Sequence, residues 1–536
     1  MTSDGRLPFE AGDDPVEARL DQRDRSAREY AQDPLHNVAL EASAGTGKTR
    51  VLVERYVRLL QAGVDPTNVV AITFTRKAAA EMRERIITRL RQAAAAGEIG
   101  AARWRELRDR LGDIAISTID AFCLSLLREF PLEADLDPGF GVADETEVPR
   151  LIAESLDRAI RICRGLAIED ETVALVFAQL GDRRATRGLT SLLARRLVAP
   201  QALARFVRGT PRTLTVESAV EAGATRLLDV LASMPGGLDA LIESGPPDPA
   251  FIVLTRTLRD LQGASSDDPG RPALVQSAYT RVMQHFLTQN GTPRKKLDYT
   301  KAEFVTEDAW RAHRDLVVTH APAVKDAAAA FKRDLNVLVS RGVARMYRVA
   351  EAEYRRTLDA HSVLDFPDLL IKAVDLLQRM EEFSRSRYRL ESRYHHVLVD
   401  EFQDTSRPQW QLVRLLVQSW GEGAGLASTG PLPPSIFIVG DRKQSIYAFR
   451  DADVSVLADA AAYMNTLRPE AAVSRAISRS FRSVGPLLGF VNDVCADLDL
   501  SPHRRDAFRF DEQDRFPLAG GTMALTADSL GRLRRD

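Results

Sequence analysis

The sequence predicts an α/β fold in which a parallel β-sheet carries helices on both faces and is interrupted by a large, mostly helical insertion. Short apolar runs followed by helical patterns occur near the start of the chain and again after residue 390. Strands that alternate with helices favour a parallel sheet covered on both sides. Between about residues 130 and 360, helical patterns dominate and Gly- and Pro-rich turns separate them. The 536 residues exceed what one hydrophobic core holds, so we expect several domains.

The first part of the sheet is predicted from three apolar runs. Val38–Leu40 is a short strand that enters a small-residue loop, and helical periodicity follows from Thr49 to Leu60. Val69–Thr75 is a buried strand, and a helix follows from Arg76 to about Ala95. Ile114–Ser117 is a further short strand that leads into a helix.

The strands of the second part of the sheet are predicted after the helical stretch. His396–Asp400 and Ser435–Gly440 are strand-like, and the Gly- and Pro-rich residues 421–434 form a surface loop between them. The run Ala471–Ile477 is expected to begin a second α/β domain.

The composition is that of an ordinary globular protein with balanced charge. Seventy-three basic and 75 acidic residues give a net charge of −2, so any surface that binds nucleic acid must be local. Three scattered cysteines have no metal-ligand spacing and favour a reducing compartment. No stretch resembles a signal peptide or a membrane span, so we predict a cytoplasmic protein without membrane contact.

The loop after the first strand has the composition of a triphosphate cradle. Its small residues leave backbone N–H groups free to face phosphates at a helix N-terminus. Lys48 is predicted to reach the terminal phosphates of a nucleoside triphosphate, and Thr49 to ligate Mg²⁺. The predicted nucleotide-binding residues of the loop are Ala42, Ser43, Ala44, Gly45, Thr46, Gly47, Lys48 and Thr49.

Two carboxylates follow the strand at 396–400. Asp400 is predicted to hold the magnesium that bridges the terminal phosphates, and Glu401 to orient and deprotonate the attacking water. The alternative is a helix N-terminus with stabilising carboxylates. The phosphate loop upstream favours the catalytic interpretation.

Three segments together resemble the UvrD/Rep-like superfamily-1 DNA helicases. Ala42–Thr49, Asp400–Thr405 and Gly440–Arg450 are similar to motifs I, II and III of this family, and the form of the third is closest to its RecB/AddA branch. Further similarities, in family order, are Thr73–Met82 (motif Ia), Ser117–Cys123 (the next DNA-contact motif), Leu364–Leu370 (the segment before motif II) and Ser480–Ser483 (motif IV).

The resemblance implies roles for residues around the phosphates and the base. Gln444 would sense the γ-phosphate, and Arg482 would add positive charge as the phosphoryl group leaves. Phe481 would stack on adenine, and Gln22 would read its edge.

The resemblance also implies DNA contacts. Tyr447 and Phe449 would stack on bases of single-stranded DNA, with core packing as the alternative interpretation. The remaining contacts would come from Thr75, Lys77 and Arg450. In the helical insertion, the turn that contains Lys295 and Lys296 would grip a duplex backbone, unless it is an ordinary solvated basic turn.

The resemblance implies five segments. These are a disordered N-terminal tail (1–20), a first RecA-like P-loop NTPase domain in two parts (21–130 and 361–465), a helical inserted domain (131–360) and the start of a second RecA-like domain (466–536).

The implied protein is an ATP- and Mg²⁺-dependent DNA helicase or translocase that moves 3′ to 5′ on single-stranded DNA in double-strand-break repair and recombination. Motifs V and VI are not found in the 536 residues, so we expect nucleotide and DNA binding with weak or absent turnover. The alternatives are a helicase subunit whose nuclease domain lies beyond residue 536, acting with a nuclease or helicase partner, and a non-catalytic DNA-binding subunit.

Overall fold

A computed structural model describes residues 15–418, 430–469, 471–497, 510 and 515–518. The chain forms two compact units, which we call unit 1 (residues 1–143 and 362–536) and unit 2 (residues 144–361). Residues 1–14 of the predicted tail, and much of the segments at 421–434 and 466–536, lie outside the described residues.

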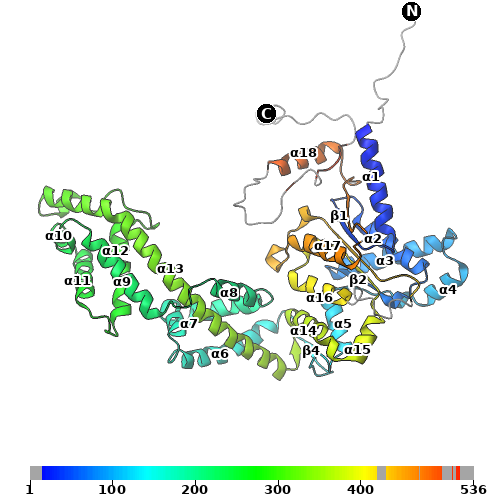
Figure 1. Ribbon diagram of the computed structural model, residues 1–536, viewed down its shortest axis with the longest axis horizontal. Helices are drawn as coiled ribbons and strands as arrows, with labels where there is room; N and C mark the ends of the chain where they lie inside the picture. Colours follow the sequence, from blue (N-terminus) through cyan, green and yellow to red (C-terminus); the bar gives the residue numbers. More distant parts are fainter. Residues whose placement is uncertain (1–14, 419–429, 470, 498–509, 511–514, 519–536) are drawn as a thin grey trace, which may run out of the picture. The chain divides into compact units, whose positions relative to one another are not determined.

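A six-stranded sheet forms the centre of unit 1 (Figure 1). All five pairs of neighbouring strands are parallel, and the strand order is β3-β2-β6-β7-β1-β8. A two-stranded parallel ladder of β4 and β5 lies outside this sheet. The strands are β1 (Val38–Ala42), β2 (Val69–Thr73), β3 (Ile116–Thr118), β4 (Gly141–Val142), β5 (Val363–Leu364), β6 (His396–Val399), β7 (Ser435–Gly440) and β8 (Ser474–Ile477).

Helices pack on both faces of the sheet, which confirms the predicted fold class. One layer contains α1 (Pro15–Gln32), α2 (Lys48–Gln61) and α3 (Arg76–Ala95), and the other contains α5 (Ile119–Glu129), α14 (Phe366–Arg379), α16 (Arg407–Gln418) and α17 (Ser455–Leu467). The remaining helices of unit 1 are α4 (Ala101–Asp109), α15 (Ser384–Glu391) and α18 (Gly485–Ala496).

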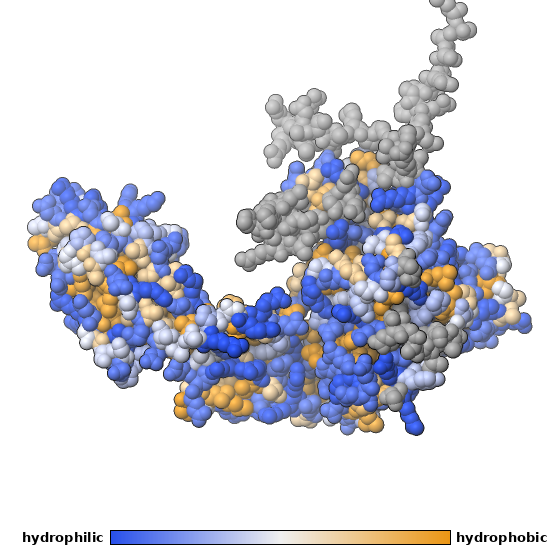
Figure 2. All heavy atoms as spheres, viewed as in Figure 1, coloured by the Kyte–Doolittle hydropathy of each residue, from blue (hydrophilic) through white to orange (hydrophobic). Residues whose placement is uncertain are grey.

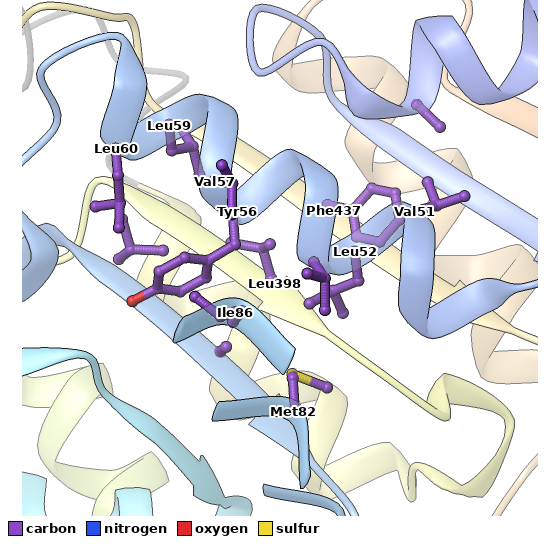
Figure 3. Close-up of a cluster of buried hydrophobic side chains, with 14 of the residues drawn as sticks. Val51, Leu52, Tyr56, Val57, Leu59, Leu60, Met82, Ile86, Leu398 and Phe437 are labelled. Atoms are coloured by element: carbon purple, nitrogen blue, oxygen red, sulfur yellow. The ribbon is translucent and has the colours of Figure 1, made fainter. Parts of the chain in front are cut away.

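Helix α2 is fixed to the sheet by its buried apolar face. Figure 3 shows Val51, Leu52 and Tyr56 of this helix against Leu398 of β6 and Phe437 of β7. All five side chains are almost fully buried, and burial of each large apolar side chain contributes about 1.5–3 kcal/mol. This packing gives the N-terminus of α2, where Lys48 lies, a fixed position.

A buried arginine fixes the turn between α1 and β1. The guanidinium of Arg55 donates hydrogen bonds to the carbonyl oxygens of Ala31 (2.9 Å) and Asp33 (2.7 Å) and to Ser435 Oγ (3.1 Å). Arg55 is fully buried, and burial lowers its pKa to about 9. These hydrogen bonds fix the end of α1 relative to the sheet.

Two features of unit 1 differ from the sequence prediction. Helix α1 begins at Pro15, inside the stretch expected to be a disordered tail, because proline suits the first turn of a helix and the residues after it favour helix. The run expected to open a second α/β domain instead supplies β8, which pairs with β1 from Ala39 to Ala42 as the edge strand of the same sheet. The apolar run itself is compatible with either sheet, so only tertiary pairing assigns it.

Unit 2 is helical. Its long helix α13 packs against α6, α7 and α9, and Pro322 lies inside it. The helices are α6 (Val148–Leu166), α7 (Glu171–Ala194), α8 (Ala199–Arg208), α9 (Val216–Ala232), α10 (Gly237–Glu243), α11 (Pro249–Gly263), α12 (Arg271–Phe286) and α13 (Glu307–Ala360). Among the described residues of the chain, none of the helices has the length and apolar character needed to cross a membrane.

Candidate nucleotide and DNA site

The predicted nucleotide-binding segments meet at one edge of the sheet in unit 1. Strands β6, β7, β1 and β8 are consecutive neighbours in the sheet and run parallel. Their carboxyl ends therefore open onto the same edge, which is where ligands bind in open α/β sheets. The loops that leave these strands carry Asp400 and Glu401, Gln444, the phosphate loop, and residues 478–482.

The phosphate loop has a backbone that depends on its glycines. Gly45 and Gly47 have φ values of +74° and +85°, a region that other L-residues rarely adopt. Thr46 closes the turn, because its hydroxyl and its N–H both donate to the carbonyl oxygen of Ser43, at 2.7 and 3.2 Å. Helix α2 begins directly after Gly47, so the first N–H groups of the helix point out of the loop. This arrangement suits an anion.

Lys48 joins three segments of the chain. Its Nζ lies 3.1 Å from Glu401 Oε2 and 3.2 Å from Gln444 Oε1, residues 353 and 396 positions away. The Nε2 of Gln444 donates in turn to Asp441 Oδ2 at 2.9 Å, and Gln403 Nε2 donates to Glu401 Oε2 at 2.8 Å. The structure thus brings together Lys48, Glu401 and Gln444, as the sequence predicts.

Asp400 and Glu401 form an acidic pair after β6. Asp400 has the properties of a metal-binding carboxylate, and Glu401 has a strained backbone. Asp400 is buried, and burial followed by the neighbouring Glu401 carboxylate raises its pKa to about 6. Glu401 has a φ of +51°, a left-handed backbone that costs energy in a residue with a side chain. Strain of this kind is concentrated at functional sites.

The residues at this edge fit Mg²⁺. No group of three or more His, Cys, Asp or Glu side chains among the described residues forms a complete metal site. Mg²⁺ bound with a nucleotide needs only one or two protein ligands, because phosphates and water supply the others. A cation beside Asp400 would also favour the charged carboxylate that burial disfavours. Asp400 and the Thr49 hydroxyl are therefore the candidate protein ligands.

Residues 478–482 lie directly on the phosphate loop. The N–H of Phe481 donates to the carbonyl oxygen of Gly45 at 2.9 Å. A Cβ on Gly45 would lie 2.5 Å from Ser480 Oγ and 2.7 Å from Arg482 Cβ. Asp24 of α1 holds the other end of this segment, since its carboxylate accepts from the N–H groups of Ser478 (3.2 Å) and Arg479 (2.9 Å). Arg482 is thereby placed beside the loop, with its side chain exposed.

The predicted base-binding residues have different surroundings. The ring of Phe481 is 70% exposed and has the guanidinium carbon of Arg28 5.3 Å from its centroid. Arg28 is also close to Gly47, where an added Cβ would lie 3.7 Å from Arg28 Nη1. Gln22, in contrast, is exposed on α1. Two other residues of this helix, Asp24 and Arg28, lie against residues 478–482 and the phosphate loop.

A cavity of about 170 Å³ lies behind the acidic pair, at the carboxyl ends of β2, β3 and β6. Its lining includes Thr73, Asp120, Asp400, Glu401 and Asp404. Among the described residues, Thr73 Oγ1 and Asp404 Oδ1 are buried without a hydrogen-bond partner. Burial and the Glu401 carboxylate raise the pKa of Asp404 to about 6.

An aromatic cluster borders this cavity, whose lining includes Phe74. The rings of Phe74 and Tyr447 are 4.6 Å apart, and those of Tyr447 and Phe449 are 5.7 Å apart. The guanidinium of Arg450, which also lines the cavity, lies 5.6 to 5.9 Å from all three ring centroids. Phe449 is 66% exposed, which excludes core packing for this residue. The cluster therefore presents an aromatic face with a fixed positive charge.

The other predicted DNA contacts do not join this cluster through a described interaction. The Thr75 hydroxyl caps α3 by accepting from the N–H of Ala78 at 3.0 Å. The Lys77 side chain is 89% exposed and lies 4.0 Å from Glu81. Lys295 and Lys296 are exposed and belong to unit 2.

Several residues of the site were not assigned from the sequence. Gln403 and Asp441 lie within motifs II and III, but the sequence analysis assigned them no role. They hydrogen-bond to Glu401 and Gln444, the partners of Lys48, and their closeness to these residues in the sequence could have indicated such a role. Asp24 and Arg28 lie near Gln22, with no local pattern that marks them. Their contacts depend on how α1 packs.

The sequence is similar to known proteins over most of its length. Residues 23–226 and 265–464 match the family "UvrD/REP helicase N-terminal domain". An ATP-dependent helicase/nuclease subunit from Pelotomaculum thermopropionicum is 30% identical over 78% of this chain and 34% of the relative. The protein of the same name from Desulforamulus reducens is 28% identical over 85% of this chain and 38% of the relative. The chain thus spans little more than a third of these two relatives.

Replacement of Gly45 by Ala is expected to displace residues 478–482 and weaken nucleotide binding. The added Cβ would collide with Ser480 and Arg482, and φ would also become unfavourable. We expect the affinity for a fluorescent ATP analogue, measured by titration, to fall about tenfold or more. Gly97→Ala is the matched control, because Gly97 has a φ of +73° and open space around its Cβ position. Equal affinities of the two variants would contradict this contact.

Replacement of Asp404 by Asn is expected to stabilise unit 1 at high pH only. Because its folded-state pKa is about 6, above the usual 3.8, the folded protein favours the protonated form. The charged form therefore destabilises the fold as pH rises from about 4 to 6, and Asn removes that cost. The gain should be about 1–3 kcal/mol at pH 8 and near zero at pH 4, measured by urea unfolding. The surface variant Asp109→Asn, whose side chain is 72% exposed, is the control. A gain from Asp404→Asn that did not vary with pH would refute the shift.

Proposed function

Because the chain belongs to the UvrD/REP helicase family, we propose that it binds ATP and DNA as part of a DNA helicase or translocase. The proposed motor moves 3′ to 5′ along single-stranded DNA and acts in double-strand-break repair and recombination. The two relatives carry the name of ATP-dependent helicase/nuclease subunits, which favours work beside a nuclease activity and a partner subunit.

The observation that carries the proposal is that Glu401 and Gln444 both contact Lys48. Its ammonium lies within hydrogen-bond distance of both Glu401 and Gln444, while the phosphate loop supplies N–H groups beside it. When ATP binds, Lys48 would exchange its contacts with Glu401 and Gln444 for contacts with the terminal phosphates. Glu401 would then be free to take a proton from the attacking water, and Gln444 to contact the γ-phosphate.

Arg482, Asp400 and Thr49 would complete the catalytic set. Mg²⁺ held by Asp400 and Thr49 would neutralise charge on the phosphates. Arg482 is placed beside Gly45 by the backbone of residues 478–482, and its guanidinium would stabilise the charge that develops on the leaving phosphoryl group. Phe481 and Arg28 would face the base, Phe481 by stacking.

Single-stranded DNA is proposed to bind at Tyr447 and Phe449. Aromatic stacking tolerates any base, as a translocase requires. Arg450 would contribute positive charge at the same place. Gln444 and Tyr447 are three residues apart in one segment, which supports coupling between the γ-phosphate and the DNA.

A non-catalytic DNA-binding subunit is the second candidate. It would tolerate loss of the hydrolytic residues, yet Lys48, Asp400, Glu401 and Gln444 are all present in one site. The catalytic proposal is therefore favoured.

The two proposed roles at Lys48 and Glu401 are separated by substitution. Lys48→Ala should reduce ATP affinity at least tenfold, whereas Glu401→Gln should retain ATP binding and lower hydrolysis by about 10²- to 10⁴-fold. Hydrolysis is best followed under single-turnover conditions, with protein in excess over labelled ATP and with single-stranded DNA present. Glu381→Gln is the control, since its side chain is 72% exposed. Normal hydrolysis by Glu401→Gln would remove Glu401 from the catalytic role.

Replacement of Phe449 by Ala tests the stacking surface. Loss of one stacked base should weaken single-stranded DNA binding by about 1–3 kcal/mol, measured by fluorescence anisotropy. Tyr388→Ala, which removes another ring that is 60% exposed in unit 1, should leave the affinity unchanged. Equal affinities of Phe449→Ala and the wild type would place the DNA elsewhere.

A further inference from the structure

The guanidinium of Arg28, on α1, has a buried donor that the free protein leaves unused. Among the described residues, no atom accepts a hydrogen bond from its Nη2. The Asp24 carboxylate is 3.9 Å away, beyond hydrogen-bond distance, and it already accepts from the N–H groups of Ser478 and Arg479. A buried donor without an acceptor destabilises a protein, and the cost is larger when the donor is charged. We therefore expect Arg28 to gain an acceptor when the site is occupied.

Two contacts show where Arg28 lies along the nucleotide site. A Cβ added to Gly47, the last residue before α2, would lie 3.7 Å from Arg28 Nη1. The guanidinium carbon lies 5.3 Å from the centroid of the Phe481 ring. Under the proposed function, Lys48 contacts the terminal phosphates and Phe481 stacks on the base. Arg28 therefore lies between the part of the site that holds the phosphates and the part that holds the base.

The surroundings of Arg28 favour an anion as the missing acceptor. Burial lowers the pKa of its guanidinium, and the positive charge of Arg50 lowers it further, against the opposite effect of Asp24. An anion beside the guanidinium would stabilise its charged form. Between the terminal phosphates and the base, a nucleotide has a ribose, which is neutral, and an α-phosphate, which is negative. Arginine binds phosphate through charge-assisted and frequently bidentate hydrogen bonds.

The other polar side chains described in this part of α1 do not face the phosphate loop. Gln22, Arg23 and Arg25 are exposed. Figure 2 shows hydrophilic residues where Figure 1 labels α1. Asp24 is buried and holds the backbone of residues 478 and 479. Arg28 is thus the cation that α1 places against the loop.

We propose that Arg28 binds the α-phosphate of the nucleotide and so links α1 to the phosphate loop when the site is filled. The inference rests on the proposed function, which supplies the nucleotide. ATP and ADP share the α-phosphate, so this contact would persist after hydrolysis and would hold both nucleotides equally. Lys48 differs, because hydrolysis changes the terminal phosphates that it contacts.

The test measures ATP, ADP and AMP as competitors of a fluorescent ATP analogue on the variant Arg28→Gln. All three nucleotides carry the α-phosphate, so the variant should weaken all three by the same factor, about tenfold. GTP should lose affinity by that factor too, because its base is not involved. Arg23→Gln is the matched control, since it removes the same charge from an exposed position on another side of α1. Its affinities should equal those of the wild type.

Circular dichroism checks that each variant is folded, and Arg28→Lys is a second, milder variant. Lysine keeps the charge but lacks the planar set of donors, so Arg28→Lys should lose less affinity than Arg28→Gln. A loss that AMP does not share would assign Arg28 to the β- or γ-phosphate, and a loss that GTP does not share would assign it to the base. Either result overturns the inference.

The wild type separates this inference from the proposed function. If the wild type binds ATP and both Arg28 variants match it, the inference falls and the proposed function stands. If the wild type binds no nucleotide, the proposed function falls as well.

Discussion

The charge of Lys48 is the constraint around which the nucleotide edge of unit 1 is organised. A partly buried ammonium is costly without partners, and here Glu401 and Gln444 supply them at 3.1 and 3.2 Å. To do so, the chain must bring the ends of β1, β6 and β7 together, which parallel strands in adjacent positions achieve. It must also hold Glu401 at a φ of +51°. Under the proposed function, a triphosphate would replace these partners, so the contacts that hold Lys48 in the free protein would also position it for the nucleotide.

The segment that leaves β7 carries two kinds of chemistry within a few residues. Gln444 contacts Lys48, and Tyr447 packs on Phe74. The start of the segment is held firmly, because Asp441 is fully buried and its N–H donates to Gln403 Oε1 at 2.9 Å. Gln403 also contacts Glu401, so both carboxyl-end loops share one hydrogen-bond network. A shift of Gln444 toward a phosphate would therefore act on a short, tethered stretch that ends at the aromatic cluster. Such a stretch has few ways to absorb the displacement before it reaches Tyr447.

A feature could be predicted from the sequence where the residues that determine it are close together in the chain. The phosphate loop needs glycines at φ-positive positions and a lysine at a helix start, and both requirements are visible in nine consecutive residues. Asp400 and Glu401 follow an apolar strand, so they could also be predicted from the local sequence. Asp24 and Arg28 were missed because α1 reaches the loop only through tertiary packing, with Arg55 fixing the turn that follows α1. β8 was assigned to a second domain because strand pairing is non-local. The hydroxyl of Thr75 caps α3, a use that a family motif does not reveal.

The net charge of −2 is compatible with the proposed DNA binding, because positive charge is concentrated locally. In unit 1, Arg450 is placed among three rings, so positive charge and stacking coincide where an unpaired base would lie. Under the proposed function, the surface in unit 1 would bind partly through ring stacking, which salt weakens less than it weakens long-range attraction between charges.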